Sequence, residues 1–303
     1  MEPIVIEGLT KRYGPVLAVD NLSFTVPAGR VTGFLGPNGA GKTTTLRILL
    51  GLVHPTSGSA TFAGRRYEDL ADPAGSVGAV LEATSFHPGR RARDHLKILA
   101  TAARIPLTRV DATLERVGLA EAGHRRVGGF SLGMRQRLGL AAALLGDPAT
   151  LILDEPTNGL DPDGVRWLRG LMRQLAGEGR TVLVSSHLLS EVAQTVDDVV
   201  IIARGSLVAQ GPIADIARRA ANQFAVLLRT PDPVQAQQVL STAGLEVDLD
   251  GEGALIVSGA TADTVGRAVA KAGLTLYEMR PLDRTLEDVF LELTSTRERS
   301  GSR

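Results

Sequence analysis

A glycine-rich segment near the start of the chain combines residue types that bind phosphate. Glycines let backbone N–H groups converge where a Cβ atom would block them, and converging N–H groups attract an anion. Within the segment, Lys42 supplies a positive charge for β- and γ-phosphates, and the Thr43 hydroxyl is a ligand type for Mg²⁺. We therefore predict a nucleoside triphosphate site. Its predicted phosphate-binding residues are Gly36, Pro37, Asn38, Gly39, Ala40, Gly41, Lys42, Thr43 and Thr44.

Acidic and imidazole side chains follow two later apolar runs. Asp154 and Glu155 end the run that begins at Thr150, and His187 follows the run over 181–185. An aspartate in this position can bind Mg²⁺, and the adjacent glutamate can polarise an attacking water. An exposed acidic turn is the alternative for the two carboxylates, and a lone histidine is more often structural. Charges directly after buried strands favour a site, because open α/β sheets bind ligands there.

Apolar periodicity indicates the elements that must position these residues. Residues 11–14 are predicted as a turn, and the helical middle region resembles an insertion between two halves of a nucleotide-binding core. Ser131 is a predicted N-cap, and from spacing alone a simple capped helix is the favoured interpretation. The predicted strands are 4–9, 21–26, 31–35, 59–62, 77–81, 150–155, 181–185, 199–203 and 207–210, and the predicted helices are 44–50, 94–104, 109–117 and 132–145.

The composition excludes several classes of protein. The 303 residues are 44% hydrophobic, which is enough for a substantial core, and carry a formal net charge of +0. A neutral chain has no global field that would recruit nucleic acid or anionic lipid. The absence of cysteine excludes disulfides and thiolate metal sites. We expect no secretory signal and no membrane span, because no apolar run approaches ~20 residues.

The order of the motifs resembles the ATP-binding cassette (ABC) proteins over roughly residues 1–215. Phosphate loops occur in many families, whereas this order and spacing are much more specific. The resemblance implies a P-loop NTPase cassette of mixed α/β class, with an antiparallel β subdomain and a helical subdomain at about 83–147. The matching motifs are the phosphate loop, the signature Phe130–Gln136, the pair Asp154 and Glu155, the D-loop Asn158–Asp161 and the switch histidine His187.

The resemblance also implies a role for each matched residue. Tyr13 would stack on adenine. Ser131 and Gly133 would contact ATP held by a second copy, so each ATP would lie between two chains paired head to tail. The implied catalytic residues are Lys42, Glu155 and His187, the implied Mg²⁺ ligands are Thr43 and Asp154, and the further implied ATP-binding residues are Tyr13, Glu82, Ser131, Gly133 and Asp161.

Two motifs depart from the family pattern. The signature L-S-G-G-Q reads Phe130-Ser131-Leu132-Gly133-Met134, which keeps the serine and the second glycine. Glu82 stands where the family usually has a glutamine. It would add a negative charge beside the two carboxylates, which Mg²⁺ would partly offset. We expect Glu82 to occupy the Q-loop with an altered coupling role.

Residues 216–295 are predicted to form a second, α+β unit, followed by a disordered tail at 296–303. The predicted order is strand, helix, strand, strand, helix, strand, as in a ferredoxin-like domain. It carries no catalytic cluster, so we expect a regulatory or dimer-stabilising role. The six predicted elements are 224–229, 233–243, 245–249, 254–258, 261–272 and 274–280, with a closing helix at 285–293.

The resemblance is greatest to ABC-2-type exporter ATPases, a group that includes daunorubicin- and bacitracin-resistance proteins. It implies ATP hydrolysis coupled to export of a drug, antibiotic or lipid-like substrate through a separate permease. We expect the permease to dock on the loop over 83–95, where Arg90, Arg91 and Arg93 cluster. The chain would then lie at the cytoplasmic face of the membrane. The alternatives are a soluble ABC ATPase of DNA repair or translation, and a non-catalytic interaction module.

Overall fold

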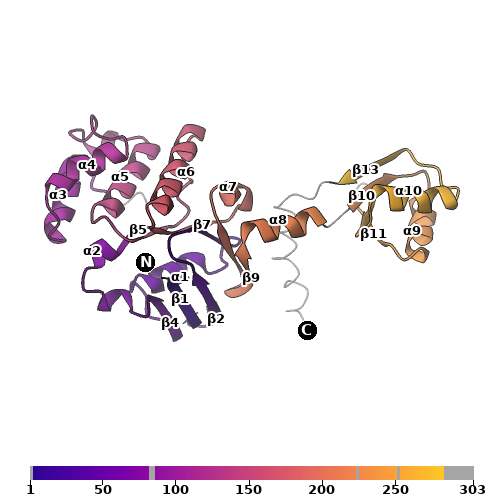
Figure 1. Ribbon diagram of the computed structural model, residues 1–303, viewed down its shortest axis with the longest axis horizontal. Helices are drawn as coiled ribbons and strands as arrows, with labels where there is room; N and C mark the ends of the chain where they lie inside the picture. Colours follow the sequence, from indigo (N-terminus) through magenta and orange to yellow (C-terminus); the bar gives the residue numbers. More distant parts are fainter. Residues whose placement is uncertain (1–2, 82–85, 223–224, 251–252, 283–303) are drawn as a thin grey trace. The chain divides into compact units, whose positions relative to one another are not determined.

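The computed structural model describes residues 3–81, 86–222, 225–250 and 253–282. The chain divides into two compact units, with the division between Ile213 and Ala214. Figure 1 shows the first unit in indigo to orange and the second in orange to yellow. The predicted Q-loop residue Glu82, the closing helix at 285–293 and the tail at 296–303 lie outside the described residues.

A six-stranded sheet forms the centre of the first unit. Its order is β5-β6-β7-β3-β8-β9, and all neighbours are parallel except the antiparallel pair β8 and β9. Every residue of β3, β6, β7 and β8 is buried, as expected for parallel strands that are covered on both faces. The strands are β3 Val31–Leu35, β5 Val77–Val80, β6 Thr150–Leu153, β7 Thr181–Ser186, β8 Asp198–Ala203 and β9 Ser206–Pro212.

A three-stranded antiparallel sheet of order β2-β1-β4 completes the β structure of this unit. The strands are β1 Ile4–Tyr13, β2 Val16–Val26 and β4 Ser57–Phe62. The predicted turn at 11–14 is wrong, because β1 continues to Tyr13, which pairs with Val16. The turn falls instead on Gly14 and Pro15, and Gly14 has the positive φ of 55° that a tight reversal needs.

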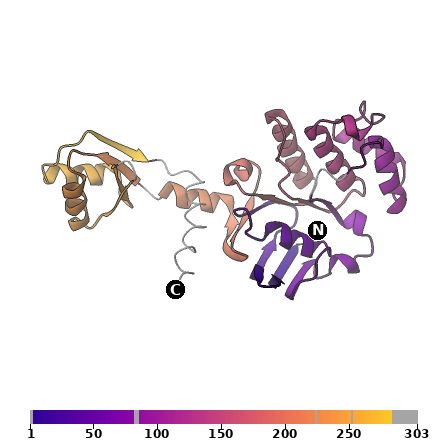
Figure 2. The same ribbon diagram turned by 180° about the vertical axis from the view of Figure 1, so that it is seen from behind.

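Helices lie on both sides of the six-stranded sheet. Helices α5 and α6 lie on one side, and α1 with the three-stranded sheet lies on the other (Figures 1 and 2). Helices α3 to α5 come between β5 and β6, which pair directly, so this helical stretch is an insertion between neighbouring strands. The helices are α1 Lys42–Leu49, α2 Pro73–Ser76, α3 Ala92–Ala102, α4 Thr108–Arg116, α5 Leu132–Leu144, α6 Pro162–Gly177 and α7 Leu189–Ala193, with short 3₁₀ helices at Tyr67–Asp69 and Val127–Gly129.

The sequence did not predict helix α8 at the start of the second unit, but the elements that follow it have the predicted order. Its antiparallel sheet is ordered β11-β12-β10-β13, the arrangement of a ferredoxin-like domain. The last strand begins at Glu278 rather than at the predicted 274, because Leu274 and Leu276 pack against the core from the preceding loop. The elements are α8 Ile213–Asn222, β10 Ala225–Arg229, α9 Pro233–Thr242, β11 Glu246–Leu249, β12 Leu255–Ser258, α10 Ala262–Lys271 and β13 Glu278–Leu282.

Two further expectations concern membrane spans and the role of the second unit. Within the described ranges, no helix has the length and apolar character that crossing a membrane requires. The regulatory or dimer-stabilising role of the second unit stays a prediction.

Candidate functional site

The phosphate loop connects β3 to α1 in a conformation that only glycine permits at two points. Gly41 has a φ of 99° and precedes the first residue of α1. A Cβ atom at Gly41 would lie 2.5 Å from the carbonyl oxygen of Ala18. A Cβ atom at Gly36 would lie 2.5 Å from the carbonyl oxygen of Ile202. These close approaches fix the loop around the N-terminus of α1, where backbone N–H groups favour an anion.

Lys42 places a positive charge inside this loop. The residue is only 6% exposed. Its Nζ atom donates hydrogen bonds to the carbonyl oxygens of Gly36 at 2.6 Å and Pro37 at 3.4 Å. The same atom lies 3.3 Å from Oε1 of Glu155. The ammonium group is therefore held between the loop and the predicted catalytic carboxylate.

Asp154 is held by hydroxyl groups on both of its carboxylate oxygens. Thr43 Oγ1 donates to Oδ2 at 2.8 Å, and Ser185 Oγ donates to Oδ1 at 2.5 Å. Asp154 is 8% exposed. A carboxylate and a threonine hydroxyl are the hard oxygen donors that Mg²⁺ prefers, and Mg²⁺ in nucleotide sites is completed by phosphates and water. The two side chains predicted to hold Mg²⁺ thus fit that ion in type and lie in contact.

Glu155 connects the phosphate loop to the predicted switch histidine. Its Oε2 atom lies 2.9 Å from Nδ1 of His187, and its Oε1 atom faces Lys42. Glu155 has a φ of 47°, which is uncommon for a residue other than glycine. Its backbone N–H donates to Ser185 Oγ at 2.9 Å. The turn that aims the Glu155 carboxylate at these two partners is therefore held from the neighbouring strand.

Parallel strand register explains why residues far apart in the sequence meet here. Leu35, the last residue of β3, pairs with Ser186 of β7, and Leu153, the last residue of β6, pairs with Val184. The phosphate loop, the two carboxylates and His187 follow these strand ends. They therefore meet at one edge of the sheet, as the sequence predicts.

The predicted signature residues lie elsewhere. Ser131 is the N-cap of α5 and accepts a hydrogen bond from the Met134 N–H at 3.2 Å, which confirms the capping prediction. A Cβ atom on Gly133 would face Leu160, in the D-loop. No hydrogen bond between described residues joins Ser131 to the phosphate loop. One chain thus brings together only part of the predicted ATP-binding set.

Two further predicted residues lie at the borders of the site. Asp161 is the N-cap of α6 and accepts a hydrogen bond from the Gly164 N–H at 2.8 Å. Tyr13 ends β1 and is 46% exposed, with Lys11 Nζ 4.9 Å from the centre of its ring. The ring is partly open to solvent, and its contact with adenine stays a prediction.

Sequence reasoning missed Ser185. The residue is fully buried in β7 and joins both carboxylate residues, through Asp154 Oδ1 and the Glu155 N–H. A single serine in an apolar run looks like an ordinary core residue. The available signal was its position at the end of a predicted strand, two residues before His187.

Comparison with protein families gives two matches. The family described as ABC transporter matches residues 19–158, which include the phosphate loop and both site carboxylates. A family described as a domain of unknown function (DUF8746) matches residues 224–287, in the second unit.

Individual relatives extend the match to almost the whole chain. The bacitracin transport ATP-binding protein BcrA of Bacillus licheniformis is 38% identical, over 94% of this chain and 95% of its own. The Nod factor export ATP-binding protein I of Burkholderia lata is 35% identical, over 96% of this chain and 97% of its own. A solved structure of an ATP-binding subunit of an ABC transporter is 27% identical with a TM-score of 0.64, over 71% of this chain and 92% of that one.

We predict that Ser185→Ala lowers kcat for ATP hydrolysis about tenfold, or ~1.4 kcal/mol, because it leaves the Glu155 N–H without a partner and Asp154 with one donor fewer. Steady-state kinetics should show a much smaller change in KM. Ser185→Thr keeps the hydroxyl and should restore most of the activity. Thr32→Val is the matched control, because Thr32 Oγ1 in the neighbouring β3 is buried without a hydrogen-bond partner among described residues. Equal kinetics for wild type and Ser185→Ala would contradict this role.

Proposed function

This chain belongs to the ATP-binding proteins of ABC transporters, and from that premise we propose that it powers export of an antibiotic- or lipid-like compound through a separate permease. Its family hydrolyses ATP to drive transport. The relatives similar to it over nearly their full length carry bacitracin transport and Nod factor export in their names.

The observation that supports ATP hydrolysis in this proposal is the position of the Glu155 carboxylate. One oxygen lies 3.3 Å from Lys42 Nζ and the other 2.9 Å from His187 Nδ1. A carboxylate fixed at both oxygens next to a phosphate-binding loop is suited to orient a water and accept its proton. Lys42 would turn to the phosphates when ATP enters. His187 would then hold Glu155 toward the attacking water.

We propose that Thr43 and Asp154 hold Mg²⁺ together with the bound phosphates. When bound, Mg²⁺ neutralises charge on the β- and γ-phosphates. Ser185 keeps Asp154 oriented through its 2.5 Å hydrogen bond, so the carboxylate need not reorganise. The phosphate loop contributes backbone N–H groups that bind the phosphates.

A second copy of the chain is proposed to complete each site. Helix α1, which follows the phosphate loop, lies on one side of the six-stranded sheet, and α5, which follows Ser131, lies on the other (Figures 1 and 2). Ser131 and Gly133 have their described contacts with Met134 and Leu160 rather than with the loop. Two copies paired head to tail would bring Ser131 and Gly133 of one copy onto the ATP held by the other.

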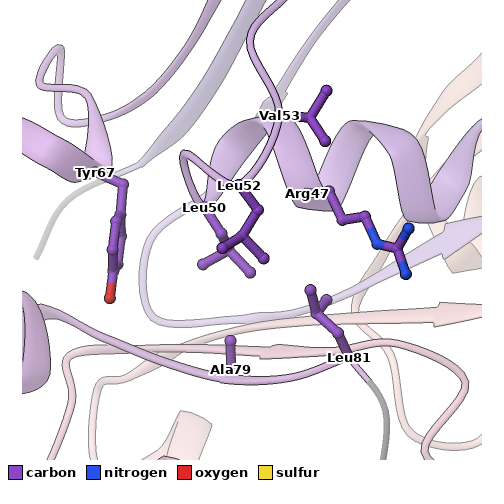
Figure 3. A pocket seen from close by; sticks show the side chains of 7 residues that line it. All are labelled: Arg47, Leu50, Leu52, Val53, Tyr67, Ala79 and Leu81. Carbon is purple, nitrogen blue, oxygen red and sulfur yellow. The ribbon is translucent and has the colours of Figure 1, made fainter.

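An apolar groove next to α1 is the proposed docking site for the permease. It has a volume of about 630 Å³. Figure 3 shows leucines from the end of α1 and the following turn facing Leu81 and Ala79 of the β5 side, with Tyr67 closing one end. Leu52 is 65% exposed, which is high for a large apolar side chain. The groove is lined by Arg47, Leu50, Leu52, Val53, Tyr67, Ala79 and Leu81.

The proposed occupant is an amphipathic cytoplasmic helix of the permease, with acidic residues beside its apolar face. A transporter subunit needs a membrane partner, and apolar side chains of a helix fit a groove of this kind. The loop after Leu81 leads to Arg90 and Arg91. Arg93 differs from them because it forms an ion pair with Asp111 at 2.8 Å. The pKa of His95 is lowered, mainly by burial and secondly by the Arg90 guanidinium. The positive charge of the segment over 86–95 therefore comes from its arginines. Docking here would place the chain at the cytoplasmic face of the membrane.

We predict that Glu155→Gln traps ATP and converts the chain to a dimer. The substitution removes the proposed base while keeping the shape of the side chain, so hydrolysis should fall about 100-fold or more. Light scattering with ATP and Mg²⁺ should give twice the monomer mass. A monomer at saturating ATP would contradict the two-copy site. Adding Lys42→Ala to Glu155→Gln is the control, and it should abolish both ATP binding and dimerisation.

We predict that Leu52→Arg reduces co-purification with the co-expressed permease about tenfold or more. The substitution places a positive charge in the apolar groove that the apolar face of the proposed partner helix would occupy. ATPase activity of the isolated chain should stay within about twofold, because the change is on the surface. Leu107→Arg is the matched control, since Leu107 is 52% exposed and does not line the groove. Equal recovery of permease with both variants would contradict docking here.

A further inference from the structure

Leu132, one of the residues that depart from the family signature, packs directly on the D-loop. It is the first residue of α5 and is 45% exposed. A Cβ atom built on Gly159 would lie 2.0 Å from Leu132 Cδ2 and 3.0 Å from its Cγ. The side chain at position 132 therefore occupies the space in which any side chain at 159 would begin.

The same helix is attached to this region at two other points. Gln136 is 4% exposed, and its Nε2 atom donates a hydrogen bond to the Pro156 carbonyl at 2.9 Å. The Arg137 guanidinium lies 4.1 Å from the centre of the Trp167 ring, in α6. The first turns of α5 thus contact both the start of the segment after Glu155 and the helix that follows it.

The segment over 156–161 follows Glu155 directly in the chain. The Asn158 N–H donates to the Glu155 carbonyl at 3.2 Å, and Asp161 caps α6 at the other end. Gly159 lies in the middle, with a φ of 75°. Leu132 of the signature packs on Gly159 of the D-loop. A side chain at position 159 would displace Leu132 and remove this contact.

We propose that Leu132 is a positioning residue for the D-loop, and that Leu132 and Gly159 form an interdependent pair. Leu132 fills the space that the missing side chain of Gly159 leaves, and this contact fixes the D-loop beside Glu155. Leu132 of the altered signature therefore fits against Gly159 in the D-loop of the same chain. When the signature of one chain contacts ATP held by the second copy, the pair links that contact to Glu155 of the chain that carries the signature. This last point rests on the proposed two-copy site.

A double-mutant cycle tests the pair. Gly159→Ala should lower kcat for ATP about tenfold in the Leu132 background and less than about threefold in the Leu132→Ala background, because the truncated side chain leaves room for the new methyl group. Leu132→Ala alone should lower kcat about threefold with little change in KM. Gly64→Ala is the matched control for backbone strain, since Gly64 has a φ of 79° and nothing within 4 Å of its Cβ position.

Two results would overturn the proposal. An equal fold-loss of kcat from Gly159→Ala in both backgrounds would mean that Gly159 is needed only for its backbone conformation. An unchanged kcat for Leu132→Ala would remove the positioning role. The thermal unfolding midpoints of the same four proteins should also be non-additive. That readout needs neither hydrolysis nor a second copy, so failure of the two-copy site would leave it intact, whereas failure of the pair would make the midpoints additive.

Discussion

The parallel register of β6, β7 and β3 is the constraint on which the rest of the structure depends. In register, the three buried strands end within two residues of one another, so Gly36, Asp154 and His187 begin their connections at one edge of the sheet. The charges then restrain one another, since Glu155 contacts Lys42 on one side and His187 on the other. A shift of register by one residue would reverse the faces of a strand and separate these groups.

Local patterns in the sequence were sufficient to predict most of the fold and the centre of the site. Apolar runs followed by glycine or by acidic residues predict the strand ends, and Ser131 predicts the start of α5. Three features could not be read locally. Ser185 and Asp154 are 31 residues apart and are joined only by sheet register. The extension of β1 to Tyr13 depends on pairing with β2, and the late start of β13 depends on core packing by the preceding loop.

The contact between Leu132 and Gly159 belongs to the same class of feature, because neither residue predicts the other. From sequence alone, Leu132 is a loss from the signature and Gly159 is an ordinary turn residue. In the structure the Leu132 side chain occupies the space that a side chain at position 159 would fill. Helix α5 therefore has two proposed functions. It would present Ser131 and Gly133 toward a second copy, and it would hold the segment that follows Glu155 in its own chain.

Mixing two inactive variants tests most directly whether one chain holds the catalytic groups while a second chain supplies the signature. Lys42→Ala disables the phosphate loop, and Ser131→Arg blocks the signature. A mixed dimer of these chains holds one intact site, so an equal mixture should recover about a quarter of the wild-type ATPase activity if the chains pair at random. An absence of recovery at every mixing ratio, with both variants folded, would contradict the shared site.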